Sequence, residues 1–288
     1  MQDWALSLEL TRSLECRLVY FGLLSLEAIM SHSIRERLSA GKTVRVMSMG
    51  VFPDPKLIEI AGLIGNLHGL WIDQEHSAVS HAQLEMLLMA CRASGLDAFA
   101  RVAPTDYATI MRPMEAGCSG VMAAQIRTLE EVAEVIHWSK YPPLGTRGLF
   151  MANAEAKYAT MSPAEHVEQS NRERWLAIQI ETTEAVDQVD EIAATAGVDM
   201  LFVGPGDLAC TLGVPGQALH PLCIAALERI SAACKKHGKP WGTLTRHPDH
   251  AAKCRDLGCQ LFSICSDVDI VQRGIQSTRE LFAELDQL

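Results

Sequence analysis

From about residue 33 the chain alternates short apolar runs with longer segments in which apolar residues recur every three or four positions. Short apolar runs are typical of buried strands, whereas the three- to four-residue spacing predicts amphipathic helices. The pattern predicts a helix after every strand. The predicted strands span residues 43–50, 69–73, 97–103, 119–126, 175–181, 198–205, 239–245 and 259–265.

Alternating strands and helices predict a parallel sheet with right-handed crossovers, an α/β architecture. Eight such units in about 250 residues fit a closed (β/α)8 barrel, known as a TIM barrel. The alternative is an open doubly wound sheet, which usually carries a glycine-rich phosphate turn after its first strand. The corresponding stretch here, "SMGVFPDP", is not such a turn. We therefore expect one barrel domain over residues 30–288.

Two segments interrupt this rhythm. Residues 141–172 contain three prolines and two glycines and form a long excursion. Long insertions of this kind are typical of lids or binding loops. We expect part of the substrate specificity to lie in this segment. Residues 18–30 are strongly apolar but include Glu27 and are too few to span a bilayer. They lack the flanks of a signal peptide. We expect residues 1–29 to be a poorly ordered extension, and we expect no membrane association.

Composition narrows the class of protein. The 288 residues carry a formal net charge of −10 and no basic run, which argues against a nucleic-acid partner. The nine cysteines are scattered without a CxxC pair, as in a reduced, cytoplasmic protein. We expect most of these thiols to act as small buried hydrophobic groups rather than as nucleophiles.

In a barrel of this type the active site lies at the carboxyl ends of the strands. Many polar and charged side chains follow the predicted strands, so we expect the catalytic and binding residues to be among them. They are Asp73, Gln74, Glu75, His76, Arg101, Gln125, Gln179, Glu181, Asp207, Thr243, Thr245, Arg246, Ser266 and Asp267.

The fifth predicted strand, within "RWLAIQIETTEAV", carries two polar residues on one face. Because strand side chains alternate, Gln179 and Glu181 both point into the barrel. A buried carboxylate needs a cationic partner or a metal. Glu181, with Asp207 from the next strand, suits Mg²⁺ or Mn²⁺ better than zinc, which prefers His and Cys. The structural alternatives are a salt bridge between Glu181 and Arg101, and a helix N-cap at Asp207.

Two further residues at neighbouring strand ends carry possible chemistry. His76 has the pKa range of a general base, although it could also be an ordinary loop histidine. Arg101 can hold a carboxylate or stabilise an oxyanion, and its structural alternative is an ion pair at the barrel rim.

The motifs "IDQEHSAVS", "ARVAPTDYATIMRPMEAGCSGVMAAQI", "YPPLGTRGL", "IQIETTEAV" and "GVDMLFVGPGDLACTLG" occur in this order. Together they resemble the metal-dependent (class II) pyruvate aldolases over roughly residues 33–275. That family includes 4-hydroxy-2-oxoheptanedioate aldolase and 2-keto-3-deoxy-sugar-acid aldolases, and macrophomate synthase is a relative. The resemblance implies a barrel whose last helix packs across a partner subunit in a dimer-based homo-oligomer, usually a hexamer.

The resemblance also implies roles for individual residues. Glu181 and Asp207 match the ligands of a divalent metal, with Mg²⁺ expected first and Mn²⁺ or Co²⁺ as alternatives. Arg101 matches the arginine that binds the pyruvyl oxygens and stabilises an enolate. His76 matches the catalytic base.

One glutamine and one glycine complete the site that the resemblance implies. Two other residues are not explained by the family pattern. Gln179 matches a substrate-site glutamine, and Gly206 lies in the turn that receives the pyruvate carboxylate. Glu115 stands where family members often carry an aspartate. Arg246, in "LTRHPDH", has no assigned role.

These residues favour reversible cleavage of a 4-hydroxy-2-oxo acid into pyruvate and an aldehyde through a metal-stabilised enolate. No lysine lies at a predicted strand end, which disfavours a Schiff-base aldolase. One alternative is a lyase for CoA thioesters of the malyl or citramalyl type. Another is a barrel that binds 2-oxo acids without catalysis.

Overall fold

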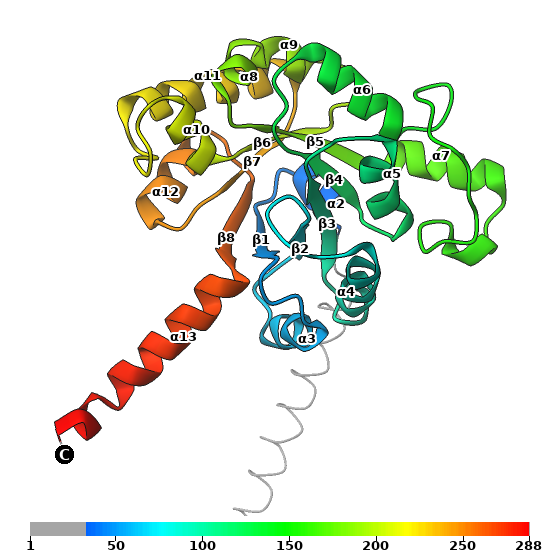
Figure 1. Cartoon of the computed structure of the whole chain (residues 1–288). Coiled ribbons are helices and arrows are strands. Elements are labelled where there is room, and N and C mark those ends of the chain that lie inside the picture. The colour runs from blue at the N-terminus through cyan, green and yellow to red at the C-terminus, as the bar shows by residue number, and fades with distance from the viewer. Residues whose placement is uncertain (1–32, 288) are drawn as a thin grey trace, which may run out of the picture. The chain divides into compact units, whose positions relative to one another are not determined.

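Eight parallel strands form a closed barrel in the computed structural model, which describes residues 33–287 (Figure 1). Each strand pairs with the next in the chain, and β8 returns to β1, so the predicted barrel is confirmed and the open sheet is excluded. The predicted extension at residues 1–29 lies outside the described residues. The strands are β1 Val44–Met49, β2 Gly69–Asp73, β3 Asp97–Val102, β4 Gly120–Ala123, β5 Trp175–Ile180, β6 Met200–Val203, β7 Trp241–Leu244 and β8 Leu261–Ser266.

Helices follow the strands around the barrel, as the apolar spacing predicts. The helix predicted after β5 is in fact two short helices, because the backbone leaves the helical conformation at Gln188. The helices are α2 Ile34–Ser39, α3 Pro55–Ile64, α4 His81–Ala93, α5 Tyr107–Glu115, α6 Leu129–Ser139, α7 Pro163–Glu173, α8 Thr183–Asp187, α9 Val189–Ala194, α10 Pro205–Thr211, α11 Pro221–His237, α12 Pro248–Asp256 and α13 Asp267–Leu281, with short 3₁₀ helices η1 Lys157–Ala159 and η2 Ala283–Gln287.

The core has two parts, one between the strands and the helices and one inside the barrel. In β5, Leu176, Ile178 and Ile180 belong to the outer cluster. Trp175 and Ala177 belong to the inner cluster. This is the alternation predicted from the sequence, and it directs the next inward position, Gln179, toward the carboxyl end of the barrel interior.

The excursion at residues 141–172 joins α6 to β5 and is more ordered than its proline and glycine content predicts. Its second half contains α7, where Ser162 and Glu165 form a capping box. The first half is held by a buried ion pair between Arg147 and Glu155, and the Arg147 guanidinium lies over the Tyr141 ring. The sequence analysis predicted an excursion here but did not identify the helix within it.

The last helix, α13, extends away from the barrel from the end of β8 (Figure 1). Several large apolar side chains toward its end are exposed, among them Ile275, Leu281 and Phe282. A helix end with exposed apolar groups is typical of a surface that packs against another molecule. Exchange of this helix with a partner subunit stays a prediction.

Two expectations from composition can be compared with the described residues. The cysteines among them are all free thiols, and most are buried, as expected for small hydrophobic groups. None of the helices in the described part is long and apolar enough to cross a membrane.

Candidate active site

A cavity of about 400 Å³ lies at the carboxyl ends of the strands. It brings together four of the predicted site residues, Arg101, Gln179, Gly206 and Asp207, from β3, β5 and the turn after β6. Glu181 is fully buried directly beside it, in contact with Gln179. The exposed His76 does not line the cavity.

Glu181 is a buried carboxylate without a cationic partner among the described residues. One of its oxygens accepts the Gln125 backbone N–H at 2.8 Å, and the other accepts the Gln179 side-chain amide. Gln125 makes this bond from a left-handed backbone conformation with φ of 57°. Burial, together with the charges of the nearby Glu75 and Asp207 carboxylates, raises the pKa of Glu181 to about 7.

The turn after β6 packs closely against this carboxylate. A Cβ at position 204 would overlap the Glu181 Oε2 oxygen and lie 2.7 Å from Gln179 Nε2. Gly204 is therefore required by the close approach of the backbone to the buried pair. At Gly206, by contrast, a Cβ would meet nothing within 4 Å, so the backbone there is open to the cavity.

Arg101 is held by two carboxylates that were on the list of strand-end residues but had no assigned role. Its Nε and Nη2 donate to Asp73 at 3.0 and 2.7 Å, and its Nη1 lies 3.2 Å from Glu75 Oε2. The guanidinium also lies over the Trp71 ring at 4.5 Å. Burial alone would raise the pKa of Asp73, but the hydrogen bonds and charge of Arg101 hold it below its usual value. The predicted alternative of a salt bridge between Arg101 and Glu181 is therefore wrong.

His76 has a looser attachment to this network. Its side chain is 63% exposed, and its Nε2 lies 3.6 Å from Glu75 Oε1. Glu75 also contacts Arg101, which lines the cavity, so His76 is linked to the site through Glu75. His76 itself does not line the cavity. Its assignment as the catalytic base stays a prediction.

Asp207 lies in the first turn of α10 and is one of the residues that line the cavity. Gly204 is the N-cap of this helix, and no side chain caps it. The alternative prediction of an N-cap role for Asp207 is thus wrong. A carboxylate in the first turn is still favoured by the helix dipole, and it keeps its oxygens available.

The donor set fits a hard divalent cation. Glu181 lacks a compensating positive charge, Asp207 presents a second carboxylate, and Gln179 Oε1 is buried without a hydrogen-bond partner. Within residues 33–287, no three His, Cys, Asp or Glu side chains converge as a complete ligand set. Two carboxylates with open positions for water and substrate are typical of magnesium sites.

The two residues left unassigned by the sequence lie in different places. Arg246 lines the cavity from the end of β7. Glu115 ends α5 and does not line the cavity. Burial holds its pKa above the usual value despite the nearby Arg147 guanidinium. Glu115 thus belongs to the surroundings of the excursion. None of the residues of the excursion lines the cavity either.

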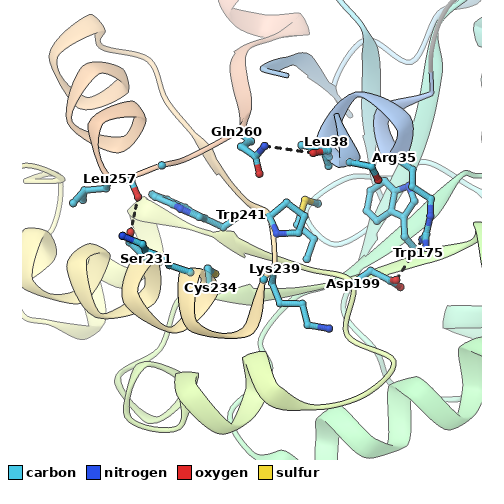
Figure 2. A pocket seen from close by; sticks show the side chains of 16 residues that line it. Arg35, Leu38, Trp175, Asp199, Ser231, Cys234, Lys239, Trp241, Leu257 and Gln260 are labelled. Atoms are coloured by element: carbon cyan, nitrogen blue, oxygen red, sulfur yellow. Dashed lines mark hydrogen bonds and ion pairs between the residues drawn. The ribbon is translucent and has the colours of Figure 1, made fainter. Parts of the chain in front are cut away.

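A second cavity, of about 480 Å³, lies at the opposite end of the barrel (Figure 2). Its lining includes Trp175 and Trp241, which begin β5 and β7, so it opens at the amino ends of the strands. At its edge Arg35 pairs with Asp199 at 3.3 Å. It contains none of the predicted site residues, and we therefore place the active site at the carboxyl ends.

A family model described as HpcH/HpaI aldolase/citrate lyase matches residues 53–273, which include the whole of this site. The chain belongs to this family. It is accordingly an enzyme, an aldolase-type carbon–carbon lyase of a family that depends on a divalent metal, and the resemblance drawn from its motifs is confirmed.

Several known proteins are similar to this chain over nearly their full length. The 5-keto-4-deoxy-D-glucarate aldolase of Klebsiella pneumoniae is 31% identical over 255 residues, covering 88% of this chain and 98% of that protein. The solved HpcH/HpaI aldolase from Desulfitobacterium hafniense has a TM-score of 0.79 at 28% identity, covering 86% and 97%. The citrate synthase SbnG has a TM-score of 0.79 at 25% identity, covering 89% and 99%.

Proposed function

We propose that this enzyme reversibly cleaves a 4-hydroxy-2-oxo acid into pyruvate and an aldehyde. The observation that carries the proposal is the buried Glu181 carboxylate, which has no cationic partner in the described chain. It accepts from the Gln179 side-chain N–H, and the oxygen of that same amide is buried without a hydrogen-bond partner. Such a pair at the mouth of a barrel is suited to a cation and an oxygen-rich substrate. The 5-keto-4-deoxy-D-glucarate aldolases to which the chain is similar make a sugar-acid substrate of this class the first candidate.

Glu181 and Asp207 would hold the divalent cation, most simply Mg²⁺, with Mn²⁺ or Co²⁺ as alternatives. When bound, it supplies Lewis-acid polarisation of the 2-oxo group. The buried position of Glu181 excludes bulk water from one side of the site, which strengthens electrostatic interactions there.

The chain's own residues would bind the substrate and move the proton. Arg101, fixed in direction by Asp73 and Glu75, presents a rigid guanidinium that stabilises negative charge developing on the pyruvyl oxygens. The open backbone at Gly206 can donate to the carboxylate of the pyruvyl moiety. His76 would accept the proton of the C4 hydroxyl as the C3–C4 bond breaks, by turning its exposed ring toward the mouth.

The direct test is release of pyruvate from 5-keto-4-deoxy-D-glucarate and from 4-hydroxy-2-oxoheptanedioate, with and without EDTA. We expect turnover of at least one substrate, loss of activity with EDTA, and recovery on addition of Mg²⁺, Mn²⁺ or Co²⁺. Full activity in EDTA would contradict the proposal. Turnover of malyl- or citramalyl-CoA alone would favour the CoA-thioester lyase, and ligand binding without turnover would favour a non-catalytic barrel.

We further propose that the enzyme works as a homo-oligomer in the cytoplasm. The exposed apolar side chains of α13 support an assembly that covers them, as the resemblance implies. The free thiols of the described cysteines are compatible with a reducing compartment.

A further inference from the structure

Arg246 is a cation of the cavity that the proposed chemistry does not use. It lies two residues after the end of β7 and lines the cavity together with Arg101, Gln179 and Asp207. Its side chain is 49% exposed, so the guanidinium reaches the solvent-filled space rather than the protein core.

The guanidinium is anchored at one nitrogen only. Arg246 Nη1 donates to Asp269 Oδ1 at 2.9 Å. Asp269 is itself fixed, because its other oxygen accepts from the backbone N–H and the hydroxyl of Ser266 at 2.9 and 2.8 Å. Within residues 33–287 the guanidinium forms no other hydrogen bond, so its remaining N–H groups are available to a ligand.

The strand order places the two arginines on opposite sides of the mouth. In the closed order β1 to β8, β3 and β7 are four strands apart, which is half of the circumference. Arg101 at the end of β3 is matched by two carboxylates, whereas Arg246 after β7 is matched by one. A substrate with an anionic group at each end could therefore contact both.

The backbone next to Arg246 adds to this preference for an anion. The helix α12 starts two residues later with Pro248 at its first position, and His247, its N-cap, makes no capping hydrogen bond through its side chain. His247 also lines the cavity. The first-turn N–H groups of a helix carry partial positive charge and lack helical acceptors.

We infer that Arg246 is a substrate-binding residue that recognises a carboxylate on the aldehyde half of the substrate. This inference rests on the proposed aldolase function and deepens it. The pyruvyl end is held on the side of β3, β5 and β6, and the far end reaches β7. The enzyme should therefore prefer acidic aldehydes over neutral aldehydes of the same length.

The test is a comparison of two aldehydes in the condensation direction, with pyruvate and metal present. Succinate semialdehyde and butanal have equal chain lengths and differ in the terminal carboxylate. In the wild-type enzyme we expect the larger kcat/KM for succinate semialdehyde. Arg246→Ala should lower the ratio of the two kcat/KM values by about 10- to 100-fold, the range for a lost hydrogen bond to a charged group.

Two further variants sharpen the comparison. Arg246→Lys keeps the charge but not the planar fork, and should recover part of the ratio. Arg255→Ala removes an exposed arginine of α12 that pairs with Asp256, and should leave the ratio unchanged. The inference would be overturned if Arg246→Ala left the ratio of the two kcat/KM values unchanged, whether or not both values fell. It would also be overturned if the wild-type enzyme had equal kcat/KM values for the two aldehydes.

A separate readout distinguishes failure of the inference from failure of the proposed function. Metal-dependent exchange of the pyruvate methyl protons with solvent deuterium reports enolate formation without any aldehyde. Wild-type enzyme that exchanges these protons but shows no carboxylate preference would refute the role of Arg246 alone. Absence of both exchange and condensation would refute the aldolase proposal, and the role of Arg246 with it.

Discussion

At the scale of single residues, the active site depends on a few close contacts around one buried carboxylate. Glu181 is enclosed by the Gln125 backbone, the Gln179 amide and the glycine at position 204. Burial and neighbouring carboxylates raise its pKa, so the site is prepared for a positive charge that the described protein does not itself provide.

Gly204→Ala should damage this arrangement without touching a charged group. The added methyl would overlap Glu181 Oε2 and crowd Gln179, so one of them must move. We expect kcat/KM for aldol cleavage to fall by at least about 100-fold, since misplacement of a site group by about 1 Å has effects of this size. Gly274→Ala, where an added Cβ meets nothing within 4 Å and φ is not positive, controls for the loss of backbone freedom. Normal kinetics for Gly204→Ala would contradict the proposed packing.

His68 makes stability depend on pH. Its Nδ1 accepts the Arg45 backbone N–H at 2.9 Å, and burial together with the charges of Arg37 and Arg45 lowers its pKa to about 4. The unfolded chain binds a proton near pH 6.5 and the native chain does not, so the contribution is complete above pH 6.5 and is lost as the pH falls toward 4.

His68→Asn keeps an acceptor for the Arg45 N–H but removes the titrating ring. Urea unfolding between pH 7.5 and 5 should show a smaller loss of the free energy of unfolding in the variant than in the wild type. Equal losses of the free energy of unfolding in the two proteins would show that His68 does not cause the pH dependence between pH 7.5 and 5.

At the scale of elements, the hydrophobic pattern predicted the barrel well. The strand β5 is the clearest case, because its alternation placed three residues toward the helices and three toward the interior. The pattern could not identify the partners of Arg101. Asp73 and Arg101 are opposite each other only in the register of β2 and β3, which local sequence does not specify.

The helix α7 was missed for a different reason. Prolines and glycines at the start of the excursion indicate irregular structure, and this signal outweighed the capping box that begins at Ser162. The buried pair of Arg147 and Glu155, which fixes the excursion, also depends on contacts between distant residues. Likewise, the residue type of Gln125 does not predict its left-handed backbone, from which it donates its N–H to the distant Glu181.

Glu155→Gln should destabilise the excursion strongly. The carboxylate and the guanidinium of Arg147 are both buried, and removal of one charge leaves the other without compensation. We expect the free energy of unfolding in urea to fall by about 3–5 kcal/mol. Glu168→Gln, in an exposed pair with Arg172, should change it by less than about 1 kcal/mol. Similar effects of the two substitutions would contradict the structural role of the buried pair.

At the scale of the whole molecule, the proposed homo-oligomer would cover the exposed apolar end of α13. We expect sedimentation velocity to give a mass that is an even multiple of the 31.5 kDa chain. Replacing Ile275 and Phe282 with glutamate should shift the protein to smaller species, since both side chains are exposed in the single chain. A wild-type protein that sediments as a monomer would contradict the oligomer proposal.

The central claim is that Glu181 and Asp207 hold a divalent cation where the pyruvyl group binds. Anomalous diffraction from a crystal grown with Mn²⁺ and pyruvate tests it most directly. The account predicts one Mn²⁺ peak at about 2.0–2.5 Å from a carboxylate oxygen of each residue, with pyruvate completing its shell beside Arg101. A Mn²⁺ peak at other residues, or none at this site with pyruvate bound, would contradict it.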